Sequence, residues 1–229
     1  MFGVSLGLEG FEDPKENWLL GPPADSLVEL GAKQGSLMKY RYEMWRYITP
    51  IFLNAGIIQL LINLFGHFRM GLYLERKWKW YVFTVIYFVS GTAGIAFSCD
   101  IQPNAVSVGA SAAFIGLMGA YFAQLHLTWF KMEGWQKRMN ISVCLVFIII
   151  TFLEGIGSNC VNTSAHLGGL FMGLLQGYSL FGLQYARRWN PSRARAVPVL
   201  GIVCCIAYFI ATVTLFYTVV PVTEQPQYW

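Results

Sequence analysis

The chain has 229 residues, of which 55% are hydrophobic and only 12% are charged, and this composition excludes an ordinary soluble domain. The formal net charge of +4 comes without a basic stripe interleaved with aromatic residues, so no nucleic-acid partner is expected. Residues 1–34 lack a basic start followed by an apolar core, so we expect no cleavable signal peptide. Membrane insertion would then rely on internal spans of a polytopic membrane protein.

Six apolar segments follow a mixed N-terminal part, and each approaches the length that crosses a bilayer as a helix. They lie at about 47–65, 80–97, 108–125, 141–157, 164–181 and 197–220. The predicted fold is therefore an all-α membrane bundle of six transmembrane helices. The first segment carries Asn54, Gln59 and Asn63, which should face protein or a water-filled cavity because amides are costly in lipid.

Loop charges predict how these spans are oriented. Lysine and arginine concentrate in the connections 66–79, 126–140 and 182–196. The alternate connections 98–107 and 158–163 carry neither residue. Basic loops usually stay cytoplasmic, so we expect the two uncharged loops, residues 1–46 and the tail 223–229 to lie outside or in a lumen.

Two polar side chains then fall at the same membrane depth. Ser111 and His166 each lie about one helical turn from the outer end of their own span. Small residues share a helical face with each of them. They are Ala112, Gly116, Gly119 and Ala120 on the Ser111 helix, and Gly169, Gly173 and Gly177 on the His166 helix. Such faces let two helices approach closely. His126 is about 22 Å further along the Ser111 helix, and His67 falls in a basic loop, so neither is expected to meet the serine.

A serine beside a histidine can perform nucleophilic catalysis. The imidazole takes the hydroxyl proton and later protonates the leaving amine. N–H groups at the start of the Ser111 helix, together with the amides of Asn63 and Gln59, could bind the developing oxyanion. The simpler alternative is a serine bonded to its own helix and a packed histidine. The cysteines show no metal-binding spacing, and we expect no metal or cofactor.

The motifs Gly109-Ala-Ser-Ala112 and Ala165-His-Leu-Gly-Gly169, preceded by Trp45-Arg46 and an amide-bearing helix, resemble the rhomboid family of intramembrane serine proteases. The resemblance covers about residues 21–183. It implies a Ser/His dyad that hydrolyses transmembrane segments of single-span proteins near their outer end, without a cofactor. It also implies Ser111 as nucleophile, His166 as general base and acid, and Asn63, with Gln59, as oxyanion donors.

The resemblance also implies an organisation and a location. Residues 47–183 would form the catalytic membrane core, 1–46 an outer segment, and 184–229 a basic cytoplasmic loop, an additional helix and a short tail. The helix after the histidine span resembles the eukaryotic secretory branch, which implies a multi-pass protein of the secretory pathway or plasma membrane. Its partners would be the lipid bilayer and single-span substrates, and its oligomeric state is left open.

Several positions depart from the family pattern. Gln59 stands where relatives commonly have histidine, and Ala112 replaces a glycine. Ile115 occupies a position where an aromatic ring often stacks on the histidine, with Phe114 as its neighbour. The stretch 21–33 looks like the segment after the first family helix, but no apolar segment precedes it, so that helix is expected to be missing.

Two rival functions follow from these residues. An inactive rhomboid-like protein would bind transmembrane clients for trafficking or degradation; Gln59 and the absent helix favour it, whereas intact Ser111 and His166 disfavour it. A small transporter or channel would need polar side chains that continue to the cytoplasmic end. Beyond His166 its helix instead offers glycine and apolar residues.

Three further expectations concern the outer end. Cys99 and Cys160 fall in outer loops and could form a disulfide. Glu154, near the outer end of the fourth span, would hydrogen-bond to a neighbouring helix. The motif Asn162-Thr163-Ser164 matches a glycosylation sequon but lies too close to the membrane for occupancy.

Overall fold

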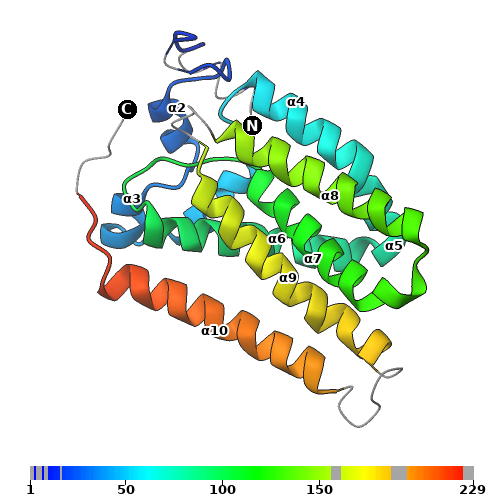
Figure 1. Ribbon diagram of the computed structural model, residues 1–229. Helices are drawn as coiled ribbons and strands as arrows, with labels where there is room; N and C mark the ends of the chain where they lie inside the picture. Colours follow the sequence, from blue (N-terminus) through cyan, green and yellow to red (C-terminus); the bar gives the residue numbers. More distant parts are fainter. Residues whose placement is uncertain are drawn as a thin grey trace.

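The computed structural model describes residues 3, 7, 10–15, 17–155, 161–186 and 195–223, with Glu154 and residues 183–186 given by their backbone alone. These ranges form a helical bundle (Figure 1), which confirms the predicted all-α class. At its centre lies α7 (Ser111–Thr128), which packs against α9 (Thr163–Ala186) and α6 (Trp80–Ile101).

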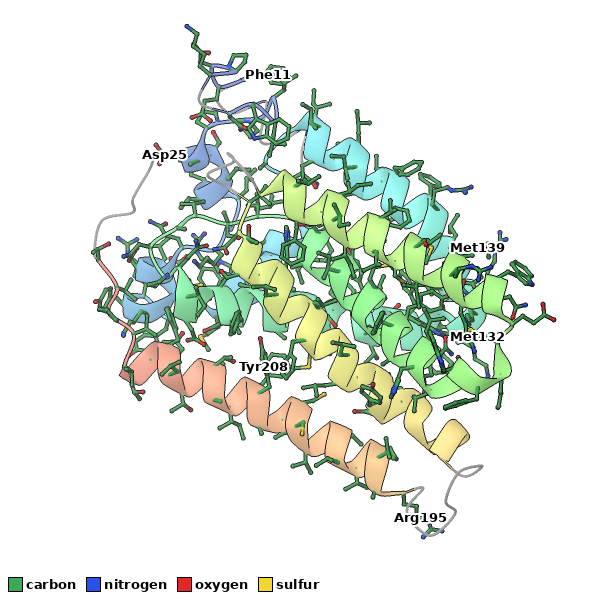
Figure 2. The ribbon with its side chains drawn as sticks, in the orientation of Figure 1. Phe11, Asp25, Met132, Met139, Arg195 and Tyr208 are labelled. Atoms are coloured by element: carbon green, nitrogen blue, oxygen red, sulfur yellow. The ribbon has the colours of Figure 1, made fainter. Side chains whose placement is uncertain are left out.

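The other elements surround this central group. In chain order they are α2 (Ala24–Glu29), α3 (Gly35–Tyr40), η1 (Met44–Tyr47), η2 (Thr49–Phe52), α4 (Ile57–Gly66), η3 (His67–Gly71), α5 (Leu72–Trp78), η4 (Trp129–Lys131), α8 (Gly134–Glu154) and α10 (Ala196–Thr218). The elements η1, η2 and η4 are short 3₁₀ turns, and η3 is a π-helical turn. The segment 10–46 covers one end of the bundle; Figure 2 places Phe11 and Asp25 there and Met132, Met139 and Arg195 toward the other end.

Four helical stretches in the described part of the chain are long and apolar enough to cross a membrane. They are Ile57–Trp78, Trp80–Ile101, Gly134–Leu153 and Ala196–Thr218. The predicted spans over α7 and α9 do not reach this criterion. For α7 the reason is its central place: 14 of its 18 residues are buried, so other helices cover most of it and glycine, alanine and polar residues replace lipid-facing side chains.

The first predicted span, 47–65, was wrong at both ends. Residues 47–56 form 3₁₀ turns and an extended stretch, and the helix begins only at Ile57. Gly56 precedes it in close contact with the backbone of Leu19, where a Cβ would lie 2.1 Å from the Leu19 carbonyl oxygen. Tyr47, Ile51 and Leu53 of this stretch are buried in the protein, whereas Ile48 and Phe52 are about half exposed.

The predicted loop 66–79 was also wrong, because the helix continues through η3 and α5 to Trp78. Only Lys79, with a φ of +74°, separates α5 from α6. Lysine and arginine are good helix formers, so a cluster of basic residues indicates a membrane boundary but not a break in the helix. His67 accordingly lies within the helical stretch, against the rings of Phe114 and Tyr87.

Two buried cations anchor the N-terminal segment. Arg46 donates to the carbonyls of Val28 and Ala32 at 2.8 and 2.7 Å and pairs with Glu43 at 2.7 Å. The fully buried Lys33 has a different target, the loop between α6 and α7. Burial lowers the pKa of the Lys33 ammonium from 10.5 to about 8, and the Cys99 thiol acts weakly in the opposite direction.

This pKa predicts a pH-dependent stability. Between about pH 8 and 10.5 the unfolded chain binds a proton at Lys33 that the folded chain has lost, so stability rises with pH in this window. We expect the unfolding temperature of the wild type minus that of Lys33→Met to be constant below pH 8 and to increase from pH 8 to 10.5. Thermal unfolding in detergent measures it, and a difference that shrinks over this range contradicts the assignment.

Candidate active site

The structure brings Ser111 and His166 together. Ser111 is the first residue of α7 and His166 lies in the first turn of α9. The Ser111 Oγ and the His166 Nε2 are 2.9 Å apart, a hydrogen-bonding distance. Each residue is only 1% exposed. The pair therefore lies in a buried site at the helix ends that face the N-terminal segment.

Small residues allow this contact, because the two side chains are short and their backbones must come close. A Cβ on Gly169 would lie 2.3 Å from the Ala112 carbonyl oxygen. On the other side of α9, a Cβ on Gly94 of α6 would lie 2.4 Å from the Ala165 carbonyl oxygen. Helix α9 is thus fitted between α6 and α7, and larger residues at either glycine would separate the dyad.

The predicted oxyanion donor Gln59 lies directly beside Ser111. Its side chain is fully buried, and its Oε1 accepts a hydrogen bond of 2.7 Å from the Ala55 N–H. Its Nε2 has no hydrogen-bond partner among the described residues. A Cβ on Gly109 would lie 2.9 Å from both this Nε2 and the Ser111 Oγ, so the two atoms border the same small space.

The glycine at position 109 is required there for its backbone as well. Its φ of +136° is strained for any residue with a Cβ, and its N–H donates to the Pro50 carbonyl at 3.0 Å. This conformation leads directly into the first turn of α7. The first N–H groups of a helix have no partner within it, so those at the start of α7 can serve as further donors beside Ser111.

Asn63 lies one helical turn after Gln59 on α4 and is also buried. Its Nδ2 donates to the Asn54 Oδ1 at 3.0 Å. A primary amide carries two hydrogens, so this bond orients the group and leaves a second hydrogen available. The first predicted span therefore places its amides toward the protein interior, as expected for polar groups in a membrane.

The aromatic neighbour of His166 comes from helix α8, which was predicted as the fourth span but not as part of the site. The Phe152 ring on α8 meets the imidazole edge-on, with 5.6 Å between the ring centroids and an interplanar angle of 77°. Ile115 is fully buried, and Phe114 packs on His67 instead, at 5.1 Å. Membrane depth could have indicated this contact in the sequence, because Phe152 and His166 both lie near the outer ends of their predicted spans.

The His166 Nδ1 has no hydrogen-bond partner in the described part of the chain. Among the described side chains the imidazole is therefore held by its contact with Ser111 and by the packing of its ring, and no carboxylate there orients it. No group of three or more histidine, cysteine, aspartate or glutamate side chains capable of holding a metal occurs within the described ranges.

The remaining expectations at the outer end have mixed outcomes. Cys99 is a buried free thiol whose Sγ lies 3.8 Å from the Met38 Sδ, whereas Cys160 lies outside the described residues. The side chain of Glu154 is also outside them. Asn162 of the sequon is buried, and its Oδ1 accepts the Ser164 N–H at 2.9 Å.

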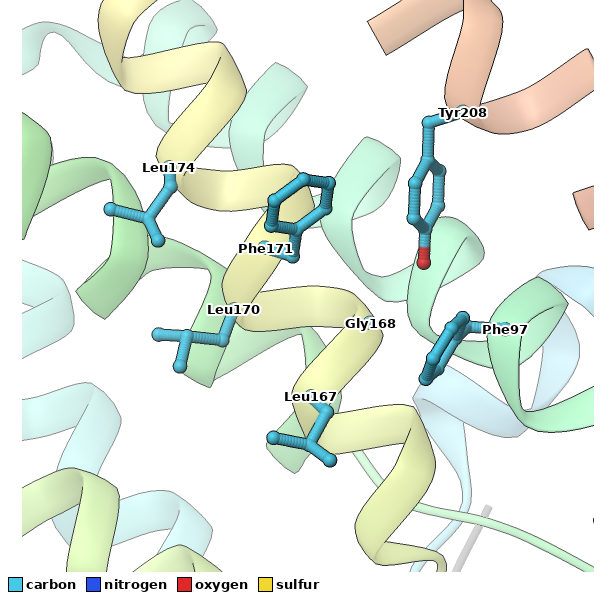
Figure 3. A pocket seen from close by; sticks show the side chains of 7 residues that line it. All are labelled: Phe97, Leu167, Gly168, Leu170, Phe171, Leu174 and Tyr208. Atoms are coloured by element: carbon cyan, nitrogen blue, oxygen red, sulfur yellow. The ribbon is translucent and has the colours of Figure 1, made fainter. Parts of the chain in front are cut away.

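A cavity of about 400 Å³ lies between α6, α9 and α10 (Figure 3). Its walls are almost entirely apolar, and its residues are Phe97, Leu167, Gly168, Leu170, Phe171, Leu174 and Tyr208. The Tyr208 hydroxyl is directed toward Phe97 across it (Figure 3). It holds none of the polar groups around Ser111, so it is separate from the candidate active site.

Comparison with known proteins agrees with this geometry. RHOMBOID-like protein 7 of Arabidopsis thaliana is 32% identical over 194 residues, which cover 84% of this chain and 60% of that protein. Rhomboid-like protease 3 of Toxoplasma gondii is 34% identical over 175 residues, covering 76% and 62%. The Inactive RHOMBOID-like protein 8 of Arabidopsis thaliana is 28% identical over 220 residues, covering 89% and 62%.

The chain spans less than two thirds of the length of these relatives, and the relatives include both a protein named as a protease and one named as inactive. Residues 41–183, which contain Ser111 and His166, match the Rhomboid domain. Together with the apolar helices, these matches identify a multi-pass integral membrane protein. The resemblance drawn from the motifs is thus confirmed, and the chain belongs to the rhomboid family.

Proposed function

We propose that this protein is a serine endopeptidase that cleaves transmembrane segments of single-span membrane proteins near their outer end. The observation that carries the proposal is the contact of 2.9 Å between the Ser111 Oγ and the His166 Nε2. A buried serine within reach of an imidazole nitrogen is the arrangement that activates an alcohol as a nucleophile.

In the first step, the Ser111 Oγ attacks the carbonyl carbon of the scissile peptide while its proton passes to the His166 Nε2. The carbonyl oxygen becomes an oxyanion. The unpartnered Gln59 Nε2, the second hydrogen of the Asn63 amide and the N–H groups at the start of α7 stabilise that charge.

In the second step, the imidazolium returns its proton to the leaving nitrogen, the C–N bond breaks, and an acyl ester on Ser111 remains. A water molecule then attacks the ester with His166 again as the base, and the serine is released. The shallow position of the dyad at the helix ends supports access for this water. No cofactor is needed for any step.

The same proposal gives the chain its organisation. Residues 47–183 act as the catalytic core, 1–46 as an outer segment, and 184–229 as a basic cytoplasmic loop, an additional helix and a tail. The dyad end faces outward because basic residues concentrate at the opposite end. We propose the secretory pathway or the plasma membrane as its location.

The direct test is labelling of the purified full chain in detergent with a fluorescent fluorophosphonate. We expect the wild type to be labelled and both Ser111→Ala and His166→Ala to lose the label, because both groups are needed for an activated serine. Ser98→Ala is the matched control, since this buried serine donates to its own helix at Ile95. A folded wild type that is not labelled would contradict the protease proposal and favour the inactive, client-binding function.

The oxyanion role of Gln59 predicts a loss in the variant Gln59→Glu. Glutamate keeps the oxygen that Ala55 contacts but replaces the donor beside Ser111 with an acceptor. Labelling at neutral pH should slow by roughly a hundredfold, the loss typical for one oxyanion donor. Gln124→Glu is the control, because its Oε1 accepts from the Trp78 Nε1 at 2.9 Å, away from the dyad. Equal rates for wild type and Gln59→Glu would remove Gln59 from the site.

The ring contact predicts that Phe152→Ala slows labelling between about two- and tenfold, the range expected for one aromatic pair. The reason is that His166 loses a group that fixes its ring. Phe147→Ala is the control on the same helix, because Phe147 contacts Phe65 and Phe114. A larger effect from Phe147→Ala than from Phe152→Ala would show that α8 packing as a whole, and not the ring contact, controls the rate.

A further inference from the structure

We propose that Lys33 is a positioning residue for this site: its side chain fixes the loop 102–110 and so keeps Ser111 and His166 in register. This inference rests on the proposed function. Lys33 lies in the segment before α3, far from the dyad in the sequence and outside residues 41–183, which match the Rhomboid domain.

The hydrogen bonds that Lys33 makes with the described residues go to the loop between α6 and α7. Its fully buried Nζ donates to the carbonyl oxygens of Gln102 and of Ala105, the latter at 2.9 Å. Its backbone pairs with Ser107 in both directions, from the Lys33 N–H at 2.9 Å and from the Ser107 N–H at 3.1 Å. A buried ammonium is costly unless hydrogen-bonded, so these carbonyls must stay in place around it.

One path from Lys33 leads along the chain to the nucleophile. Ser107 is followed two residues later by Gly109, which has a positive φ and is bonded to Pro50. Ser111 follows as the first residue of α7. The segment between the Lys33 contacts and the nucleophile is therefore short and fixed at both ends, and displacement of the loop moves Ser111 and the space beside Gln59.

A second path leads to the base through Gln102. While Lys33 holds the Gln102 carbonyl, the Gln102 Oε1 lies 3.4 Å from the Ser164 Oγ at the start of α9, a long contact beside the shorter hydrogen bond in which this hydroxyl donates to the Asn162 Oδ1. Ser164 precedes His166 by two residues, so Gln102 connects Lys33 to the helix of the base. One side chain of the N-terminal segment is thus linked to both members of the dyad.

Lysine suits this task because its partners are backbone carbonyls. The ion pair within the described ranges joins Arg46 and Glu43, and Lys33 has no carboxylate partner there. An ammonium has three donors, so it can hold two carbonyls separated by three residues. A methionine of similar length would fill the space without holding either.

The chain offers a matched control in Lys39. Its Nζ also donates to two backbone carbonyls, those of Phe216 at 3.0 Å and Val220 at 2.5 Å. These partners lie at and just after the end of α10. The chain that follows meets the loop 102–110 at a side chain, where the Thr223 N–H donates to the Asn104 Oδ1 at 2.9 Å, and not at the Gln102 and Ala105 carbonyls that Lys33 holds. Lys39→Met therefore removes the same kind of hydrogen bonds from different backbone carbonyls.

The experiment compares the full-length wild type, Lys33→Met and Lys39→Met in detergent by hydrogen exchange with mass spectrometry and by fluorophosphonate labelling rate. For Lys33→Met we expect faster exchange in peptides covering 102–110 and 162–166, and labelling slowed by about tenfold or more, as for loss of a charged hydrogen bond. For Lys39→Met we expect faster exchange at 216–223 and labelling within about twofold of the wild type.

Gln102→Leu tests the second path separately and keeps the proposal testable if Lys33→Met does not fold. The Gln102 side chain is exposed, so its loss should leave the fold intact. We expect faster exchange at 162–166, unchanged exchange at 102–110, and slower labelling than in the wild type. Unchanged exchange in both segments would overturn the link to His166.

The outcomes separate this inference from the proposed function. Equal slowing of labelling in Lys33→Met and Lys39→Met would indicate general destabilisation and would overturn the positioning role. Unchanged exchange at 102–110 in a folded Lys33→Met would overturn it as well. An unlabelled wild type with the expected exchange in Lys33→Met would contradict the protease activity while supporting the clasp on the loop.

Discussion

The close backbone contact between α7 and α9 is the constraint on which the rest of this structure depends. A Cβ on Gly173 would lie 1.9 Å from the Gly116 carbonyl oxygen, so the two helices touch through their main chains. In a bilayer, apolar side chains gain little by leaving lipid, and helices associate through such close packing. Because this contact sets the spacing of the two helices, it also sets the spacing of Ser111 and His166, whose short side chains cannot compensate for a wider gap.

The dyad also depends on residues that do no chemistry themselves. The imidazole has no partner at Nδ1 among the described residues, so its orientation comes from packing, with Phe152 as the aromatic neighbour. Beside Ser111, the positive φ of Gly109, which glycine adopts without strain, leaves room for the Gln59 amide. In the proposal above, Lys33 adds a further constraint by holding the loop that leads to Ser111. The position of the pair therefore depends on four segments of the chain, as expected when no third side chain among the described residues orients the imidazole.

Sequence reasoning predicted the part of the site that depends on one-dimensional position. Ser111 and His166 could be matched because depth follows from residue count along a helix. It failed where the structure depends on three-dimensional packing. The apolar stretch 47–56 was interpreted as part of a membrane span. The contact between Phe152 and His166 was missed because it depends on how α8 and α9 are rotated relative to each other. The basic cluster before α6 was interpreted as a loop because charge indicates a membrane boundary and not backbone conformation.

The junction at Lys79 has a consequence for biosynthesis. With a single residue between α5 and α6, the stretches Ile57–Trp78 and Trp80–Ile101 form a helical hairpin with almost no connecting loop. Arg76, Lys77 and Lys79 gather at its tip, and moving three cations through hydrocarbon is costly. The two helices should therefore enter the bilayer as one unit. The charged tip of the hairpin should stay on the side of the membrane where the chain is synthesised. The orientation of α7 and α9, which follow, is then decided before Ser111 has been synthesised.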